Sequence, residues 1–397
     1  MGKWKQTFGD NSGLMAILPS LPSTLKSHLL QVITGNGGWI GFDRFMEIVL
    51  YTPNLGYYAR GNAQFGAMPS GENGQGSDFV TAPEMTAFFG RALAVQVAQA
   101  LQVTDTRELW EFGAGSGALA AQLLEVLGDR LDRYTIVDLS GALRQRQAEV
   151  LGAYAAKVCW VTELPARLRG VIVGNEVLDA MPVKLLVRSS GGWHERGVQV
   201  GPGETLAWSD RISGLRPPVE IDGPHDYLTE IHLAAEGFVR TLADRLEQGA
   251  AFFIDYGFPE REYYHAQRAM GTVMCHQAHR MDTDPLVDMG HKDITAHVNF
   301  TGLALAAQDA ATAAGKSAVD GTACDDFGVL GYTTQARFLL NCGLLPMLEQ
   351  ATLQERAMAQ KLVMEHEMGE LFKVIGFFKG APWQAIGFAE GDRTHTL

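Results

Sequence analysis

The stretch ELWEFGAGSGALAAQLLEVL, Glu108 to Leu127, decides the fold. It opens with a short apolar run that ends in three glycines, Gly113, Gly115 and Gly117. Helical periodicity follows at once, because apolar residues recur on one face from Leu119 onward. A strand, a glycine turn and a helix in this order form the nucleotide pocket of α/β sheets. There the backbone approaches a ligand closely and the helix N-terminus presents free N–H groups.

Composition places the chain among globular proteins of one enlarged domain or two. It has 397 residues, of which 46% are hydrophobic and 19% charged. The net charge of −13 argues against nonspecific binding to nucleic acid or to an anionic membrane. Cysteine occurs at Cys159, Cys275, Cys324 and Cys342, and no two of these form a C-x-x-C pair. We therefore expect reduced thiols, with neither a disulfide framework nor a zinc site.

Targeting signals and membrane spans are not evident. No apolar run reaches the roughly 20 residues of a membrane-spanning helix. The opening residues, MGKWKQTFGDNSG, lack the hydrophobic region of a signal peptide and are not rich in arginine. On these grounds we expect no membrane span and a cytoplasmic protein.

Strand-like and helical segments alternate along the chain, which predicts a parallel, doubly wound α/β sheet. Further strands are predicted at 134–138, 157–161, 170–174, 250–256 and 371–379, and helices at 25–32, 42–50, 81–102 and 231–246. Two stretches break the alternation. One is a hairpin with a Gly-Gly turn in 184–210, and the other is helical, with a Gly-rich loop near 313–332. We expect an N-terminal helical extension over 1–100 and a nucleotide-binding domain over 101–397, with insertions at about 184–226 and 291–365.

Glu111 indicates which nucleotide the glycine turn binds. Gly113-x-Gly115-x-x-Ala118 matches a loose dinucleotide fingerprint, but an acid beside the turn would repel a pyrophosphate. S-adenosylmethionine (SAM) carries a sulfonium and an ammonium, which an acid attracts. Asp138, followed by Leu139, ends the next strand at the distance of a ribose-binding acid, and either cofactor needs such an acid. Glu111 therefore favours SAM.

The stretch NEVLDAMPV, which begins at Asn175, follows the predicted strand 170–174. Asn175 and Glu176 are expected over the cleft, at the carboxyl ends of the strands, with Asp179 on the same side. The alternative is that Glu176 or Asp179 caps the next helix.

Three more side chains are candidates with structural alternatives. Glu84 stands three residues after Thr81, in the spacing of a capping box. Asp255, which ends the strand at 250–256, either faces the cleft or binds loop amides. His297 lies in an apolar stretch, where it is either a buried core histidine or a base. His276 and its neighbouring acids fix no metal geometry, so no metal site is predicted.

Seven ordered motifs resemble one family, the MidA-like SAM-dependent methyltransferases, whose mitochondrial member is a complex I assembly factor that methylates an arginine of a complex I core subunit. The resemblance spans nearly the whole chain. The motifs are LYTPNLGYY (50–58), SDFVTAPE (77–84), WEFGAGSG (110–117), GNEVLDAMPV (174–183), FIDYG (253–257), DITAHVNF (293–300) and MGELFKV (368–374).

The resemblance implies a class I SAM methyltransferase, Rossmann-like, with an N-terminal helical extension and substrate-side insertions. It places the methionyl part of SAM on Gly113, Ala114, Gly115 and Gly117, the ribose on Asp138, and Asn175 and Glu176 at the methyl-donor end. The family usually has a proline where Ala114 stands and an acid where Asn299 stands. If that acid binds the substrate guanidinium, the target or the efficiency differs here.

Methyl transfer to an arginine needs carboxylates that pair with the guanidinium and orient one nitrogen. The candidates are Glu176, Asp179, Asp255 and Glu84, with His297 as a base or orienting residue. The expected partner is a protein substrate, with a complex I subunit and a homodimer as further expectations. Alternative hypotheses are a methyltransferase for a small molecule or another side chain, a non-catalytic assembly factor, and a dehydrogenase.

Overall fold

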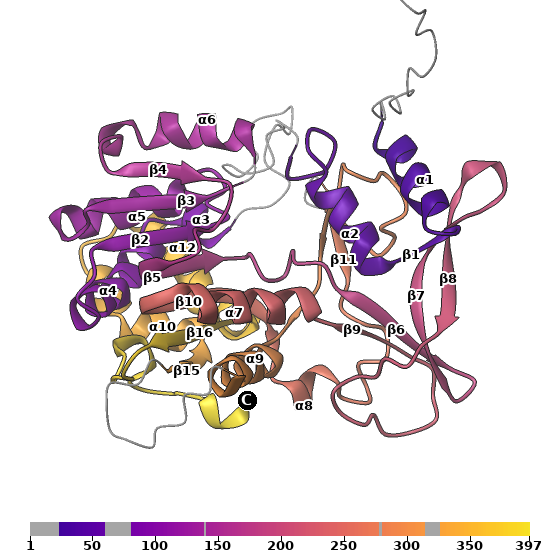
Figure 1. The fold of residues 1–397 in the computed structure, drawn as a ribbon. Helices are drawn as coiled ribbons and strands as arrows, with labels where there is room; N and C mark the ends of the chain where they lie inside the picture. The colour runs from indigo at the N-terminus through magenta and orange to yellow at the C-terminus, as the bar shows by residue number, and fades with distance from the viewer. Residues whose placement is uncertain (1–23, 60–80, 139, 278–279, 314–325) are drawn as a thin grey trace, which may run out of the picture.

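The structure, a computed structural model, describes residues 24–59, 81–138, 140–277, 280–313 and 326–397. Figure 1 shows two lobes. One is built around a large twisted sheet with helices on both faces. The other contains helices α1 (Leu25–Gly35) and α2 (Phe42–Tyr51) and smaller antiparallel sheets.

The large sheet confirms the predicted α/β class. Its strands from β4 to β10 are parallel, and β16 and β15 extend it in antiparallel fashion. The short β14 (Val298–Asn299) also pairs with β10. In spatial order the strands are β15 (Phe327–Thr334), β16 (Phe372–Lys379), β10 (Leu246–Phe258), β5 (Leu168–Asn175), β2 (Glu108–Phe112), β3 (Arg133–Val137) and β4 (Val158–Val161).

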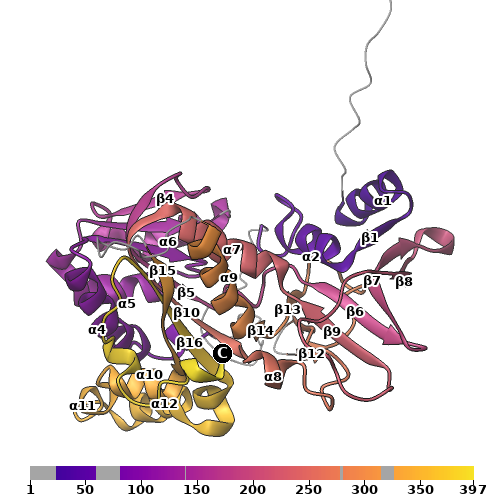
Figure 2. The ribbon, with the colours of Figure 1, turned by 60° about the horizontal axis from the view of Figure 1, so that its bottom comes forward.

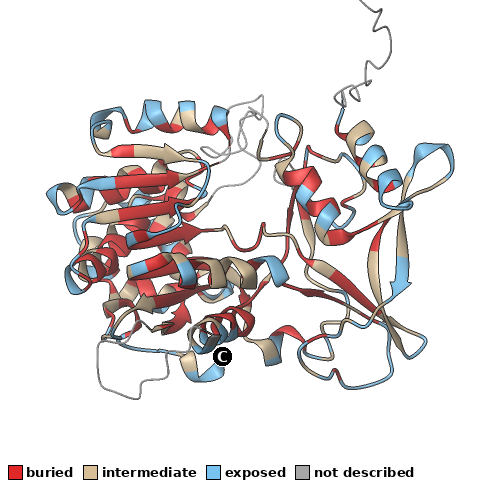
Figure 3. Ribbon diagram, viewed as in Figure 1, coloured by how far each residue is buried: buried red, intermediate tan, exposed pale blue. Residues whose placement is uncertain are grey.

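Two hydrophobic cores hold helices against the two faces of this sheet. Burial follows the strands through the middle of the lobe (Figure 3). Removing this apolar surface from water is the main stabilising contribution to such a layered fold. One face carries α4 (Phe88–Val103), α5 (Ala118–Leu127), α10 (Gln335–Asn341) and α12 (Leu353–Val363), and the other carries α7 (Leu233–Arg245) and α9 (Phe300–Ala313). The remaining helices of this lobe are α3 (Ala82–Met85), α6 (Gly141–Val150) and α11 (Leu344–Met347).

The second lobe is assembled from segments far apart in the sequence, and a third core packs α1 and α2 against its strands. Figure 2 shows these strands and helix α8 beside the large sheet. The larger antiparallel sheet contains β1 (Trp39–Gly41), β7 (Gly192–Val200), β6 (Lys184–Ser189), β9 (Tyr227–Ile231) and β8 (Leu206–Ile212). The smaller contains β12 (Arg280–Asp282), β11 (Met274–Gln277) and β13 (Asp293–Thr295), and α8 spans Glu260–Tyr263.

Three boundaries differ from the sequence prediction. The helix expected over 81–102 breaks at Thr86, whose extended backbone lets its hydroxyl accept a hydrogen bond from the Phe88 N–H (3.3 Å). Ile231 belongs to β9 and not to the following helix, because its segment pairs with β6. Part of the expected Gly-rich loop is strand β15, where two glycines hide the strand pattern.

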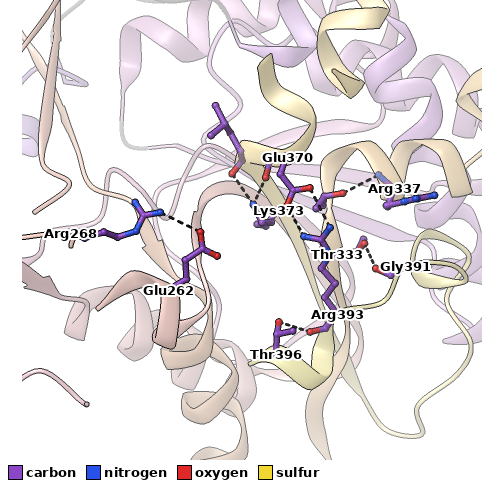
Figure 4. A network of polar contacts seen from close by, with 11 residues as sticks. Glu262, Arg268, Thr333, Arg337, Glu370, Lys373, Gly391, Arg393 and Thr396 are labelled. Atoms are coloured by element: carbon purple, nitrogen blue, oxygen red, sulfur yellow. Dashed lines mark hydrogen bonds and ion pairs between the residues drawn. The ribbon is translucent and has the colours of Figure 1, made fainter. Parts of the chain in front are cut away.

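The C-terminal segment is fastened to the antiparallel edge of the large sheet (Figure 4). Arg393 forms an ion pair with Glu370 (2.6 Å), and its N–H donates to the Tyr332 carbonyl. The Thr333 hydroxyl donates to the Gly391 carbonyl (2.7 Å). These bonds join the C-terminal segment to β15 and to Glu370, which lies two residues before Phe372, a residue of β16 that reaches the cavity described next.

Candidate functional site

The glycine turn lies where the strand order of the parallel sheet reverses, after β2 and beside β5, which is where such sheets bind ligands. Gly113, Gly115 and Gly117 have φ of 62°, 52° and 87°, values that favour glycine. A Cβ on Gly113 would lie 3.1 Å from Val177. The turn therefore presents bare backbone, and Gly117 caps the N-terminus of α5.

A cavity of about 1220 Å³ opens in front of this turn, with walls from both lobes. The charged residues of its lining are predominantly acidic. Among the described lining residues the only arginine is Arg245, which donates to the Leu164 carbonyl (2.7 Å). The acids of the lining are Glu47, Glu84, Glu111, Asp138, Glu163, Glu176, Asp179 and Asp293. A cavity of this composition favours cationic ligands.

Glu111 reaches the cavity from β2 and is almost fully buried. The Tyr134 hydroxyl donates to its carboxylate (2.7 Å). Burial raises the pKa of Glu111 to about 8, with a further rise from Asp138 and an opposing effect of the Tyr134 hydrogen bond. No ion pair between described residues includes this carboxyl, and a bound cation would favour its ionised form.

Asp138 lies just beyond β3 with its carboxylate in the cavity wall. The Ser140 N–H and the Gln147 side-chain amide each donate to one of its oxygens (both 2.8 Å). Gln147 also donates to the Gly115 carbonyl (3.0 Å) and so joins the glycine turn to Asp138. Nothing in the sequence pattern of α6 marked Gln147. Leu139, the other residue predicted here, lies outside the described residues.

Asn175 ends β5 and Glu176 follows it, and both line the cavity together with Asp179. Glu176 has a φ of 54°, rare for a residue with a side chain, and the Asn175 amide donates to its carboxylate (3.0 Å). Burial, followed by the charge of Asp179, raises the pKa of Glu176 to about 8. Burial also raises the pKa of Asp179 to about 6, against the lowering effect of the Tyr256 hydroxyl.

Asp255 binds loop amides and does not line the cavity. Its Oδ2 accepts from the N–H groups of Val177, Leu178 and Asp179 (3.1, 2.8 and 3.2 Å), and its Oδ1 accepts from the Tyr256 N–H (2.9 Å). Burial, with Asp179 and Glu176 nearby, raises its pKa well above the usual range. Asp255 therefore fixes the loop that carries Asp179, and we assign it a positioning role.

Replacing this carboxylate tests that role. We expect Asp255→Asn to lower the free energy of unfolding by ~2 kcal/mol, because the new NH₂ group must face at least one N–H donor. Urea unfolding measures the change. An equally stable variant would contradict a clamp on this loop.

Two tyrosines of the N-terminal lobe line the cavity, and one of them contacts Asp293, a carboxylate that was not predicted from the sequence. The Tyr58 hydroxyl donates to Asp293 (2.8 Å), and the Tyr51 hydroxyl donates to the Ala180 carbonyl (2.8 Å). All three side chains line the cavity, and the two rings stack at 5.5 Å. Asp293 is the first residue of the motif DITAHVNF, but the residues predicted from that motif were His297 and Asn299.

Thr81 and Glu84 also line the cavity, at the start of α3. The predicted capping box is present, with the Thr81 N–H 3.5 Å from the Glu84 carboxylate. Ala114 is buried in the turn. Its side chain contributes to the core beneath the cavity floor.

His297 lines the cavity beside Tyr256 and Phe258, with ring centroids 5.2 Å from each. Burial lowers its pKa to about 4, with further lowering by Arg268 and Lys373. Figure 4 shows these two cations, of which Arg268 pairs with Glu262 and Lys373 donates to the Glu370 carbonyl. His297 is therefore neutral near pH 7.

Asn299 lies outside the cavity lining, at the start of α9. Its Oδ1 accepts from the Gly302 N–H (3.3 Å), so it acts as a helix cap. A Cβ built on Gly302 would meet Asn299 Nδ2 and Glu236 Oε1 at 3.2 Å each, so the Asn299 amide lies near the Glu236 carboxylate.

The place of Asn299 at the start of α9 predicts the effect of an acid at this position. We expect Asn299→Asp to keep the cap but to lower stability by ~1 kcal/mol, because two carboxylates then approach each other. Thermal unfolding measures the stability. Methyl transfer should remain within about twofold of wild type. A tenfold change in transfer at unchanged stability would show that this side chain serves the substrate.

The residues at the glycine end fit SAM. The turn has no side chain that would obstruct the approach of a ligand to its backbone, and Glu111 is a buried carboxyl without a cation. The side-chain oxygen of Asn175 is buried at the cavity and accepts no hydrogen bond from the described residues. A ligand with a sulfonium, an ammonium and ribose hydroxyls supplies the charges and donors that these groups lack.

Comparison with known proteins agrees with this fit. Residues 92–317 match the family model described as "Putative S-adenosyl-L-methionine-dependent methyltransferase". The mitochondrial protein arginine methyltransferase NDUFAF7 of Danio rerio is 27% identical, over 82% of this chain and 78% of its own. The human protein of that name is 26% identical, over 96% and 88%.

Solved structures share the whole architecture. A Burkholderia thailandensis protein bound to S-adenosyl-homocysteine is 48% identical, with a TM-score of 0.84 over 94% of this chain and 96% of its own. A native structure from the same organism is 46% identical, with a TM-score of 0.81 over the same shares. The class I methyltransferase fold is thereby confirmed.

The predicted cytoplasmic location is wrong on this comparison, because the curated relatives of fish, frog and human are named as mitochondrial proteins. Composition and the opening residues carried too little information on this point. In the part of the chain that the structure describes, no helix is long and apolar enough to cross a membrane.

Proposed function

Because the chain belongs to the family of SAM-dependent methyltransferases, we propose that it transfers methyl groups to the guanidinium group of an arginine in a protein substrate. One observation carries the choice of acceptor. Beyond the glycine turn the cavity is bordered by Glu84, Glu176, Asp179 and Asp293, and the only lysine or arginine of the described lining is Arg245, which donates to the Leu164 carbonyl. A guanidinium, with five N–H donors and one positive charge, matches such a set.

SAM is the cofactor, and its bound form supplies a methyl group on a positively charged sulfur. Gly113, Gly115, Gly117 and Asn175 would hold its amino-acid part, Asp138 its ribose, and Glu111 would offset its positive charge. The B. thailandensis relative with S-adenosyl-homocysteine bound supports this use of the site. The protein's contribution to such a reaction is mainly alignment of the acceptor nitrogen with the methyl carbon.

Glu176 and Asp179 are the residues that we assign to the acceptor. Burial raises the pKa of Glu176 to about 8 and that of Asp179 to about 6, so a bound cation would favour the ionised form of each. A guanidinium that enters would pair with these two carboxylates, with which no lysine or arginine of the described residues forms an ion pair. When the nitrogen forms its bond to the methyl carbon and the bond from carbon to sulfur breaks, the proton lost by the nitrogen passes to a Glu176 oxygen.

His297 and Asp255 act differently in this scheme. His297, neutral because of its lowered pKa, orients the acceptor and is a poor proton acceptor at pH 7. Asp255 holds the loop of Asp179 in place. The NDUFAF7 relatives are named protein arginine methyltransferases, which supports arginine as the target. A respiratory complex I subunit is the acceptor that the family resemblance implies.

The test is incubation of the protein with tritiated SAM and a lysate that lacks the endogenous enzyme. We expect label in a protein band, with mass spectrometry locating it on an arginine. Label that stays with small molecules would instead favour a small-molecule methyltransferase. Calorimetry showing SAM binding without turnover would favour a non-catalytic assembly factor.

A further inference from the structure

Glu230, on β9, is a fully buried carboxylate that lies outside the cavity. Its Oε1 accepts from the N–H groups of Thr272 (2.7 Å) and Val273 (3.2 Å). Its Oε2 accepts from the Tyr263 hydroxyl (2.7 Å). None of the ion pairs between described residues includes Glu230, so neutral donors alone stabilise this carboxylate. The donors are Thr272, which lines the cavity, its neighbour Val273, and Tyr263, which contacts Thr272.

The loop around Gly271 is shaped to reach this carboxylate. Gly271 has a φ of 69°, and a Cβ there would lie 2.7 Å from Glu230 Oε1. Only a residue without a side chain fits this approach. The next residue, Thr272, lines the cavity.

A directed chain of hydrogen bonds connects Glu230 to the cavity. The Tyr263 hydroxyl donates to Glu230 Oε2, and a hydroxyl has only one proton to donate. The Tyr263 oxygen then lies 3.0 Å from Thr272 Oγ1 and accepts the Thr272 proton. The N–H of His297 also donates to Thr272 Oγ1 (3.1 Å). With its proton directed to Tyr263, Thr272 has no proton left for the cavity.

Given the proposed function, we propose that Thr272 is a specificity residue that offers a hydrogen-bond acceptor to the guanidinium, and that Glu230 is the positioning residue that fixes this polarity through Tyr263. A guanidinium has donors and no acceptor. A hydroxyl that faced it with its own proton would leave two donors opposed, and unpaired buried donors are costly. The chain from Glu230 prevents that arrangement.

Glu230→Gln reverses the direction of the hydrogen bonds from residue 230 through Tyr263 to Thr272, with almost no change in the shape of the side chain. The amide oxygen still accepts from Thr272 and Val273, while the NH₂ group donates to Tyr263. His232 Nε2, 3.4 Å from the Tyr263 oxygen, donates to the His297 carbonyl and cannot accept, so Tyr263 must then donate to Thr272, whose proton turns toward the cavity. We expect kcat/KM for an arginine peptide to fall ~30-fold, mainly through KM, with the Kd of SAM unchanged.

The control is Glu195→Gln, on β7 of the same antiparallel sheet. This change weakens the ion pair of Glu195 with Lys184, but Glu195 belongs neither to the hydrogen-bond chain from Glu230 nor to the cavity lining. It should lower stability and leave the KM of the peptide unchanged. Thr272→Val combined with Glu230→Gln should cost no more than Thr272→Val alone, because both changes remove the same acceptor. Tyr263→Phe, which interrupts the chain, serves if Glu230→Gln does not fold.

Calorimetry with paired peptides separates this inference from the proposed function. The wild type should bind an arginine peptide more tightly than the matching citrulline peptide, and Glu230→Gln should reduce that preference at least tenfold. Additive losses in the double variant, or a preference that Glu230→Gln leaves unchanged, would overturn the role of Glu230. A wild type that shows the preference but methylates no arginine would refute the proposed function and leave the polarity argument standing.

Discussion

Glu176→Gln is expected to bind SAM as the wild type does and to transfer methyl groups ~10³-fold more slowly. Glutamine keeps the shape of the side chain and its contact with Asn175. It loses the negative charge that pairs with the guanidinium and the oxygen that takes up the proton. A factor of ~10³ corresponds to about 4 kcal/mol of lost transition-state stabilisation, a usual effect of removing a charged group and a proton acceptor together.

The pH dependence gives this prediction a second readout. Since the pKa of Glu176 in the free protein is raised to about 8, the ionised form grows as pH increases from 6 to 9. We expect kcat/KM of the wild type to rise over that range, with its midpoint near pH 8, and to level off above it, because this profile reports the free enzyme. The residual activity of Glu176→Gln should lack this rise.

Glu260→Gln is the matched control for that experiment. Burial, followed by Glu236, also raises the pKa of Glu260, but this side chain does not line the cavity. Its profile should match the wild type. Calorimetry measures SAM binding and scintillation counting measures transfer. Normal transfer by Glu176→Gln would remove Glu176 from the reaction and leave Asp179 and Asp293 as the carboxylates of the acceptor.

Local sequence patterns predicted the parts of the site that one segment builds. The glycine turn, Glu111 and the stretch from Asn175 are each contiguous with the strand that carries them, so strand and turn signals sufficed to place them. The alternation of strands and helices likewise predicted the large sheet. Its antiparallel edge was harder to see, because the glycines of β15 interrupt the pattern of a strand that is defined by pairing with β16.

Contacts between distant segments could not be predicted in this way. Tyr58 and Asp293 are 235 positions apart, and only the docking of the two lobes makes them partners. The three amides bound by Asp255 and the link from Gln147 to Asp138 also depend on tertiary packing. An acid at the end of a strand has the same local signature whether it faces a ligand or a loop, so sequence left both readings of Asp255 open.

Glu111→Gln is expected to stabilise the free protein and to weaken SAM binding. The folded-state pKa of Glu111 is raised to about 8 from its ordinary value of 4.5. The folded protein therefore binds more protons than the unfolded chain between about pH 4.5 and 8, and its stability falls as pH rises through that window. Below the window the carboxyl is neutral in both states. Above it the full cost of a buried charge applies, on the order of 4 to 5 kcal/mol as an upper limit.

Glutamine carries no charge at any pH, so the variant should lose part of this pH dependence, and its advantage over the wild type should grow from pH 5 to pH 8. Urea unfolding at pH 5 and pH 8 measures this difference in stability.

The Kd of SAM should rise at least ~10-fold at pH 8, because the attraction for the cofactor's positive charge is lost. Glu108→Gln, on the same strand but paired with Arg133 outside the cavity, should change neither SAM binding nor the pH dependence. A Glu111→Gln variant that binds SAM as tightly as the wild type would show that the glycine turn alone selects the cofactor. In that case the buried charge of Glu111 would destabilise the protein without strengthening SAM binding.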